Sequence, residues 1–236
     1  MAKHGKHHQE AIKAVDRDRN YTPDEALDLA KETARAKFDE TLEIHLRTGS
    51  DPRHADQLIR GVALLPHGLG KEVRVLVFAA GEAATAARQA GADHVGDDDI
   101  IQRIEGGWLE FDVAIATPDM MGKIGRLGRV LGRRGLMPNP RAGTVVQAQD
   151  FGRAVQEAKQ GRIEFRLDRS GIIHAPLGKI SFEKQMLMEN MNSLVDTVVR
   201  ARPSAVKGQF IRTAYLTTTM GPSIRLDVSR LLAMNN

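Results

Sequence analysis

Hydrophobic and polar residues alternate in two segments that lie far apart in the sequence. In residues 41–47, Leu42, Ile44 and Leu46 are separated by polar side chains, and residues 210–219 show the same period in a Thr-rich segment. Because successive side chains of a strand point to opposite faces, each segment predicts a strand with one buried and one open face. The open face of the second strand is expected to carry Ile211, Thr213, Tyr215, Thr217 and Thr219.

The same reasoning predicts further elements near both ends of the chain. Thr22 followed by a proline and two acidic residues is typical of a helix start, and we expect this helix to span 23–37. A polar arm or short helix precedes it. Strands are expected at 58–65 and in a hairpin formed by 162–168 and 172–175, and a helix at 182–200.

The middle of the chain has a different pattern. Short apolar blocks at 73–78 and 111–116 predict buried strands, with briefer strands near 94–95 and 144–146. Helical segments alternate with them at 82–90, 97–104, 119–131 and 150–159. Strands that alternate with helices favour a mostly parallel sheet that is covered on both sides.

These patterns predict an α+β protein in which one domain interrupts another. Residues 1–67 and 160–236 are expected to form a discontinuous α+β domain, and residues 68–159 an inserted three-layer α/β domain. Glycine-containing turns near Gly68 and Gly161 mark the two crossings between them.

Composition excludes several kinds of protein. The sequence has no cysteine, which excludes disulfides, thiolate catalysis and Cys-ligated metal sites. It has neither an apolar run of membrane-spanning length nor a secretory signal, so we expect a cytoplasmic protein without a membrane partner. The net charge is +4, and residues 160–236 hold 11 Lys and Arg against 6 Asp and Glu. This excess points to a polyanionic partner.

The segment 207–223 lies within that basic third and contains no acidic residue. Its predicted open face is a row of hydroxyls with one aromatic ring, which suits hydrogen bonding and stacking with RNA. Gly221 then exposes the backbone, because glycine has no side chain. Pro222 ends the hydrogen bonding between strands, because proline has no N–H to donate. The alternative is an ordinary Thr-rich edge strand followed by a turn.

A second basic segment, 122–149, has six basic residues and no acidic one. Its glycines at 122, 125, 128, 132 and 135 would form one stripe on a helix, where each interior glycine costs about 1 kcal/mol. We expect close packing to explain this stripe. Phosphate contact is the expected role of basic residues in this segment, with Lys123, Arg126, Arg129, Arg133, Arg134 and Arg141 as candidates.

Motifs for catalysis are missing. Gly68 to Lys71 resembles the end of a phosphate-binding loop, but Leu65 and Glu72 occupy positions that require glycine and Ser or Thr. The three-glycine turn of a dinucleotide-binding site is also absent after Phe78, where the chain reads Ala79-Ala80-Gly81-Glu82. We therefore expect no cofactor and no metal, and an α/β nucleotide-binding enzyme remains the alternative function.

The longer motifs together resemble the L-one family of bacterial large-subunit ribosomal proteins. The matching segments are 36–57, 65–71, 125–145, 161–179 and 207–223. The resemblance implies a discontinuous RNA-binding domain with an inserted Rossmann-like domain. It implies a non-catalytic protein of the large ribosomal subunit, monomeric off the ribosome, with ribosomal RNA of the mobile stalk, exit-site tRNA and its own operon's messenger RNA as partners. Release of deacylated tRNA and repression of its own translation would be its roles.

The resemblance also assigns site residues. The family's Thr-Met-Gly contact triad falls on Thr219, Met220 and Gly221, and its RNA-facing aromatic residue falls on Phe38. The residues themselves point to others on the same polar sheet face: Lys37, Thr41, Arg166, His174, Thr213 and Thr217. Arg53 and Ser223, within matching segments, complete the predicted RNA-binding set. The chain departs from the family by having Arg133 where Pro is common, and by a longer C-terminal end that we predict to be an inert tail.

Overall fold

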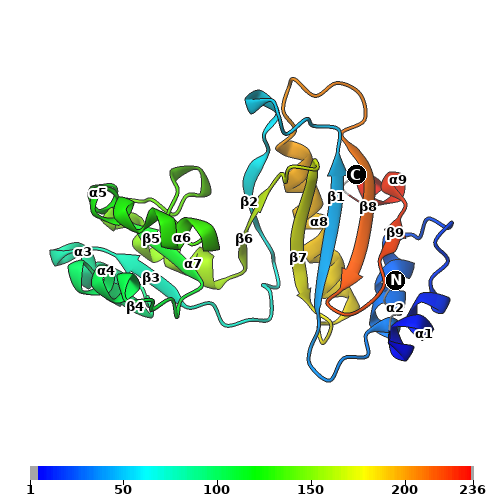
Figure 1. The fold of residues 1–236 in the computed structure, drawn as a ribbon, viewed down its shortest axis with the longest axis horizontal. Coiled ribbons are helices and arrows are strands. Elements are labelled where there is room, and N and C mark those ends of the chain that lie inside the picture. Colours follow the sequence, from blue (N-terminus) through cyan, green and yellow to red (C-terminus); the bar gives the residue numbers. More distant parts are fainter. Residues whose placement is uncertain (1–4, 235–236) are drawn as a thin grey trace. The chain divides into compact units, whose positions relative to one another are not determined.

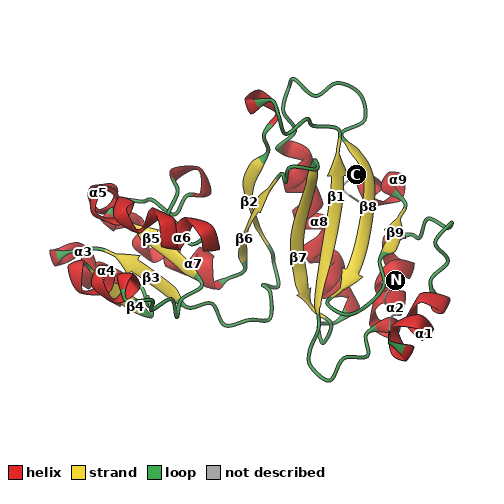
Figure 2. Ribbon diagram, in the orientation of Figure 1, coloured by secondary structure: helices red, strands yellow, loops and turns green. Residues whose placement is uncertain are grey.

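The computed structural model describes residues 5–234, apart from the side chain of Arg141. The chain divides into two compact units, Met1–Gly70 with Ile163–Asn236, and Lys71–Arg162 (Figures 1 and 2). None of the described helices combines the length and the apolar character needed to cross a bilayer.

The first unit is built on a four-stranded antiparallel sheet with the order β7-β1-β8-β9 (Figure 1). The strands are β1 (Thr41–Thr48), β7 (Ile172–Lys179), β8 (Ile211–Thr218) and β9 (Ile224–Leu226). The two alternating segments of the sequence are β1 and β8, and they pair directly. Both strand predictions are therefore confirmed.

One face of this sheet holds the core of the unit. Leu42, Ile44 and Leu46 of β1 are fully buried, together with Leu216 of β8. They share one hydrophobic cluster with residues of helices α2 (Pro23–Thr33) and α8 (Lys184–Arg200). The helices cover this face because their apolar stripes and the apolar face of the sheet are removed from water together.

Helix α2 begins and ends for local reasons. Thr22 and Glu25 form a capping box at its start. The helix stops at Thr33 and not at Lys37 as predicted. The backbone N–H of Ala36, which would otherwise continue the helix, donates to the carboxylate of Glu40 at 2.9 Å.

The hairpin predicted around Asp168 was wrong in its pairing. Strand β6 (Arg162–Arg166) pairs with β2 (Arg60–Leu64) in a separate two-stranded sheet, whereas β7 pairs with β1. The two arms are joined near the turn by the bridge between Leu167 and Ile173 and by the N–H of Asp168, which donates to the Ile172 carbonyl at 2.9 Å. Asp168 still forms the turn, because its carboxylate accepts the N–H groups of Ser170 and Ile172.

The second unit has a parallel sheet with the order β4-β3-β5. Its strands are β3 (Val75–Phe78), β4 (His94–Gly96) and β5 (Val113–Ala116). Val75 and Val77 of β3 pack with helices α3 (Gly81–Gln89) and α7 (Phe151–Lys159). Leu76 and Phe78 pack with α4 (Asp98–Glu105) and α6 (Gly128–Arg134). The predicted covering of both faces is confirmed, but the strand expected at 144–146 is only a single bridge.

The helix predicted at 119–131 is broken into short pieces. Between Pro118 and Arg134 the chain forms two 3₁₀ turns, the four-residue helix α5 (Met121–Ile124) and then α6. Frequent glycines weaken a continuous α-helix, which accounts for the change of hydrogen-bond pattern. A Cβ added at any of the five glycines of the stripe would meet nothing within 4 Å. The expectation of close packing was therefore wrong, because the stripe faces open space.

The C-terminal end and the N-terminal arm are both structured in the part of the chain that the structure describes. After β9, Asp227 caps helix α9 (Val228–Ala233) by accepting from the N–H groups of Ser229 and Arg230. Leu226 and Leu231 are buried in the core of the first unit. The prediction of an inert tail was wrong, since its described part forms a helix and contributes Leu231 to the core. Before α2, residues Lys6–Ala14 form helix α1.

Candidate nucleic-acid interface

Two large apolar side chains are exposed where β1 begins and β8 ends. Phe38 is 56% exposed and Met220 is 63% exposed. Phe38 lies in the loop before β1, and Met220 lies in the turn after β8. Because Leu42 and Thr218 are register partners, these two segments are neighbours. We call residues 37–41 and 219–221 the turn surface.

A buried carboxylate holds the turn surface together. Glu40 is only 2% exposed. One of its oxygens accepts the N–H of Ala36 at 2.9 Å, and the other accepts the N–H of Met220 at 2.8 Å. Burial alone would raise the pKa of Glu40, but these backbone hydrogen bonds outweigh it and hold the pKa below its ordinary value. Sequence reasoning assigned no role to Glu40, and an acidic residue directly before a buried strand was the available signal.

The predicted Thr-Met-Gly triad divides into two structural roles. The Thr219 hydroxyl accepts the N–H of Thr41 at 3.0 Å and faces the Thr41 carbonyl oxygen at 3.4 Å. Gly221 is required by space, because a Cβ there would lie 2.3 Å from Oγ1 of Thr218. These two residues shape the turn, and Met220 contributes its exposed apolar side chain.

The loop before β1 has further anchors. The Lys179 ammonium donates to the Thr41 hydroxyl at 2.9 Å and to the Asp39 carbonyl at 3.2 Å. The Asp39 carboxylate in turn accepts from the N–H and the hydroxyl of Ser181. Phe38 therefore lies in a loop whose residues on either side are held by hydrogen bonds. A loop that is already ordered loses less conformational entropy when a ligand binds.

The hydroxyl-bearing face of the sheet is open as predicted, with one exception. Thr213, Tyr215 and Thr217 are partly exposed, and Ala214 and Leu216 between them are buried. Ile211 was expected on the open face but is buried, because the register shifts at the Arg47–Thr48 position of β1 and reverses the alternation.

Two histidines meet on the open face. Nδ1 of His45 lies 2.8 Å from Nδ1 of His174, and Nε2 of His174 lies 3.3 Å from the Asp168 carboxylate. Only one proton fits between the two facing nitrogens. Burial, followed by the nearby charge of His174, lowers the pKa of His45.

The remaining predicted RNA-binding residues are scattered. Lys37 is exposed in the loop before β1 and is not part of a strand. Arg166 is exposed on β6, so its expected place on the main sheet was wrong. Arg53 is exposed in the loop that follows β1. Ser223 lies beside Thr217 and Gly221 at a small pocket of about 260 Å³ that α1 also borders.

The candidate phosphate contacts of the second unit fall into two groups, apart from Arg141, whose side chain lies outside the described structure. Lys123 pairs with Asp97 and Asp98, which raise its pKa, and Arg126 pairs with Glu105. By contrast, Arg129, Arg133 and Arg134 are exposed, and their guanidinium groups have no polar partner among the described residues. In the same described part, no group of three His, Asp or Glu side chains could hold a metal ion.

Comparison with known proteins gives a consistent result. Residues 30–222 match the sequence model of the Ribosomal protein L1p/L10e family. The chain is 62% identical to the large ribosomal subunit protein uL1 of Dehalococcoides mccartyi over 234 residues, which cover 99% of both chains. It is 57% identical to the uL1 protein of Thermomicrobium roseum, with 97% of this chain and 95% of the relative covered. Against uL1 of Thermobifida fusca the identity is 58%, with 95% of each chain covered.

Glu40→Gln is expected to destabilise the first unit. A glutamine amide can accept only one of the two N–H groups, so the N–H of Ala36 or Met220 loses its partner inside the protein, at a cost of about 1–3 kcal/mol. Urea denaturation followed by circular dichroism measures the change. The matched control is Glu32→Gln, an exposed position on α2, which should change the unfolding free energy by less than about 0.5 kcal/mol. Equal stability of the two variants would contradict the bridging role of Glu40.

The histidine pair predicts a loss of stability in mild acid. Because the pKa of His45 is lower in the folded than in the unfolded state, unfolded chains bind more protons below about pH 6.5. The unfolding free energy should therefore keep its highest value above that pH, and it should decrease as the pH falls from about 6.5 toward the lower pKa of His45 in the folded state. Denaturation midpoints measured from about pH 7.5 to about pH 5.5 test this, since those values bracket the ordinary histidine pKa of about 6.5. His45→Asn should flatten the dependence, whereas His54→Asn, at an exposed loop position, should leave it unchanged.

Proposed function

The chain belongs to the ribosomal protein L1p/L10e family, and from this we propose that its first unit binds ribosomal RNA of the large subunit's mobile stalk through the turn surface. As a member of this family it is a structural ribosomal protein. The finer roles, which are aiding the release of deacylated tRNA from the exit site and repressing its own operon by binding messenger RNA, are part of the same proposal. We further propose that it is monomeric off the ribosome.

The observation that carries the proposal is the exposure of Phe38 and Met220 on a rigid, hydrogen-bonded turn. An exposed aromatic ring is suited to stacking on an unpaired base, and single-stranded loops of folded RNA present such bases. Beside them, the Thr217 hydroxyl and the Lys179 ammonium supply donors for sugar and phosphate oxygens, and the Thr213 hydroxyl lies farther along the same open face. The surface combines stacking and hydrogen bonding on one fixed frame.

Under this proposal the two units have different tasks. The discontinuous first unit is the RNA-binding domain, and the inserted unit, Rossmann-like in its parallel sheet covered by helices, contacts tRNA. The segment with Arg129, Arg133 and Arg134 supports the second assignment. These arginines are exposed next to glycines whose Cα positions face open space, so a phosphate backbone can approach the chain closely.

Met220→Asp tests the turn surface directly. The change removes an exposed apolar contact worth about 2 kcal/mol and adds a negative charge facing phosphates, so the affinity for a ribosomal RNA stem fragment should fall by at least about thirtyfold. Fluorescence titration measures it, and the melting temperature should stay close to that of the wild type because Met220 is exposed.

Leu64→Asp is the matched control for this variant. Leu64 is 48% exposed on β2, away from the turn surface, and its substitution should leave RNA affinity unchanged. RNA binding by the wild type should also weaken steeply as salt rises. Wild-type affinity in the Met220 variant would refute the turn surface, and saturable binding of ATP or NAD would favour the enzyme alternative.

Arg129→Gln combined with Arg133→Gln tests the second unit. If these side chains contact phosphates of tRNA, the double variant should bind deacylated tRNA about tenfold more weakly and with a smaller salt dependence. Its affinity for the ribosomal RNA fragment should not change. A gel-shift titration with both RNAs separates the two effects, and Lys123→Gln, at a residue already paired with two aspartates, serves as the comparison. An equal loss for both RNAs would contradict the division of tasks.

A further inference from the structure

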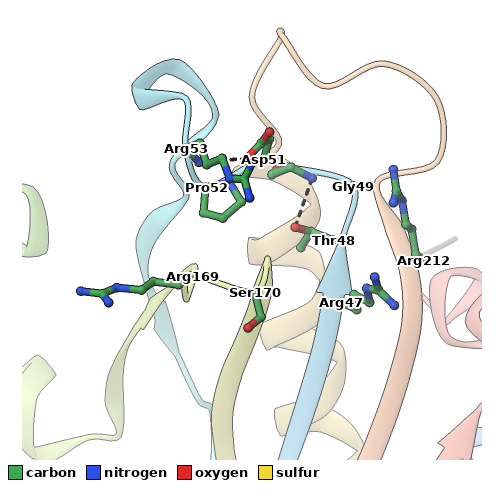
Figure 3. A pocket seen from close by; sticks show the side chains of 10 residues that line it. Arg47, Thr48, Gly49, Asp51, Pro52, Arg53, Arg169, Ser170 and Arg212 are labelled. Carbon is green, nitrogen blue, oxygen red and sulfur yellow. Dashed lines mark hydrogen bonds between the residues drawn. The ribbon is translucent and has the colours of Figure 1, made fainter.

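The end of the sheet far from the turn surface carries a pocket of about 410 Å³ bordered by four arginines (Figure 3). They come from the end of β1, the loop after β1, the turn before β7 and the start of β8. In that order they are Arg47, Arg53, Arg169 and Arg212. Asp51 is the single acidic residue in the lining. The lining thus carries four positive charges and one negative charge, and the Arg169 side chain extends away from the other three arginines (Figure 3).

The guanidinium groups of these arginines are available for a ligand. Among the described residues, none of the four guanidinium groups makes a hydrogen bond or an ion pair. Elsewhere in the protein arginines are commonly neutralised, as Arg60 is by Glu164. Arg47 and Arg212 come from paired strands at the same end of the sheet. Neighbouring positive charges repel one another, and an anion bound at these side chains would relieve the repulsion while accepting charge-assisted hydrogen bonds.

A β-bulge places Arg212 at this pocket. Arg47 pairs with Thr213 and Thr48 pairs with Ile211, so Arg212 is the extra residue between two paired positions. Regular alternation would send Arg212 toward the core side of β8. Because of the bulge, Arg212 is exposed and the next residue, Thr213, is partly exposed as well. Bulges commonly redirect a side chain at the end of a strand, and here the redirected side chain is cationic.

The frame that carries the arginines is fixed by backbone hydrogen bonds. The N–H and hydroxyl of Thr48 both donate to the Gly171 carbonyl, at 2.8 and 3.0 Å. The N–H of Gly49 donates to the Phe210 carbonyl at 2.7 Å. Gly49 also packs so closely that a Cβ would lie 2.8 Å from the Gln209 carbonyl oxygen. Binding therefore requires ordering of the arginine side chains but not of the loop.

One hydroxyl in the lining lacks a partner. Ser50 is 7% exposed, and its Oγ makes no hydrogen bond within residues 5–234. Buried hydroxyls are rarely left unpaired in folded proteins. Because this oxygen is itself inaccessible to solvent, it does not contact a ligand in the pocket.

We propose that this pocket binds a backbone phosphate of the RNA that also contacts the turn surface. The inference rests on the function proposed above. The turn surface and the pocket lie at opposite ends of the eight-residue strand β1, which separates them by roughly 25 Å at about 3.3 Å per residue. A folded RNA stem lying along the open face reaches both. The pocket then sets how strongly binding depends on salt, and the turn surface sets which RNA structure is bound.

The test is the double variant Arg47→Gln, Arg212→Gln, titrated with the ribosomal RNA stem fragment between about 0.05 and 0.2 M KCl. We expect affinity at the lower salt to fall at least about tenfold. The slope of log affinity against log salt should become less steep by about one for each phosphate that the variant no longer neutralises. Folding should be unaffected because neither guanidinium has a partner in the described structure. Arg88→Gln, at an exposed arginine of α3, is the control and should change neither quantity.

The outcomes separate this inference from the proposed function. If the double variant keeps wild-type affinity and slope while Met220→Asp loses binding, the phosphate pocket is refuted and the RNA-binding function stands. If both variants bind like the wild type, the proposed function fails. Calorimetric titration with inorganic phosphate tests the other source of the anion. If the wild type binds phosphate and the double variant does not, while the RNA affinity of the two is equal, the pocket is a site for free phosphate. That result would overturn the proposed RNA contact.

Discussion

The buried carboxylate of Glu40 is the interaction on which the candidate interface depends. It joins the N–H of Ala36 to the N–H of Met220, groups that lie near opposite ends of the sequence. The two N–H groups bond to different oxygens of one carboxylate, so a side chain with a single acceptor atom at this position would not match both. Because Glu40 is charged and buried with its hydrogen bonds satisfied, Phe38 and Met220 can remain exposed without the turn itself being mobile.

The arginines of the protein differ in whether a carboxylate lies close enough to neutralise them. Some cations, such as Arg126 and Arg162, are neutralised by nearby carboxylates and contribute to local structure. Others are gathered in two places without a carboxylate partner in the described structure, one around the pocket at the end of β1 and one in the segment 129–134. Surface ion pairs contribute little to stability, so leaving these arginines unpaired costs the fold little and keeps them available for phosphates.

The sequence was a good guide wherever local periodicity decides the structure. The strands at 41–48 and 211–218, the parallel sheet of the second unit and its helices at 81–89 and 151–159 all follow from alternation or helical spacing. The errors occurred where partners at a distance decide. The strand at 162–166 had the right conformation but pairs with β2, and the glycine stripe at 122–135 faces open space where packing was expected.

The candidate site shows the same division. By itself, the sequence determined which face of β8 carries hydroxyls, because alternation along a strand is a local property of the backbone. It also carried the Thr-Met-Gly motif and Phe38. Only the tertiary structure decided that Glu40 links the loop and the turn, that Arg166 lies on another sheet, and that a bulge turns Arg212 outward to join three other arginines. These features depend on strand register and on contacts between distant residues, which no local pattern of hydrophobic and polar positions encodes.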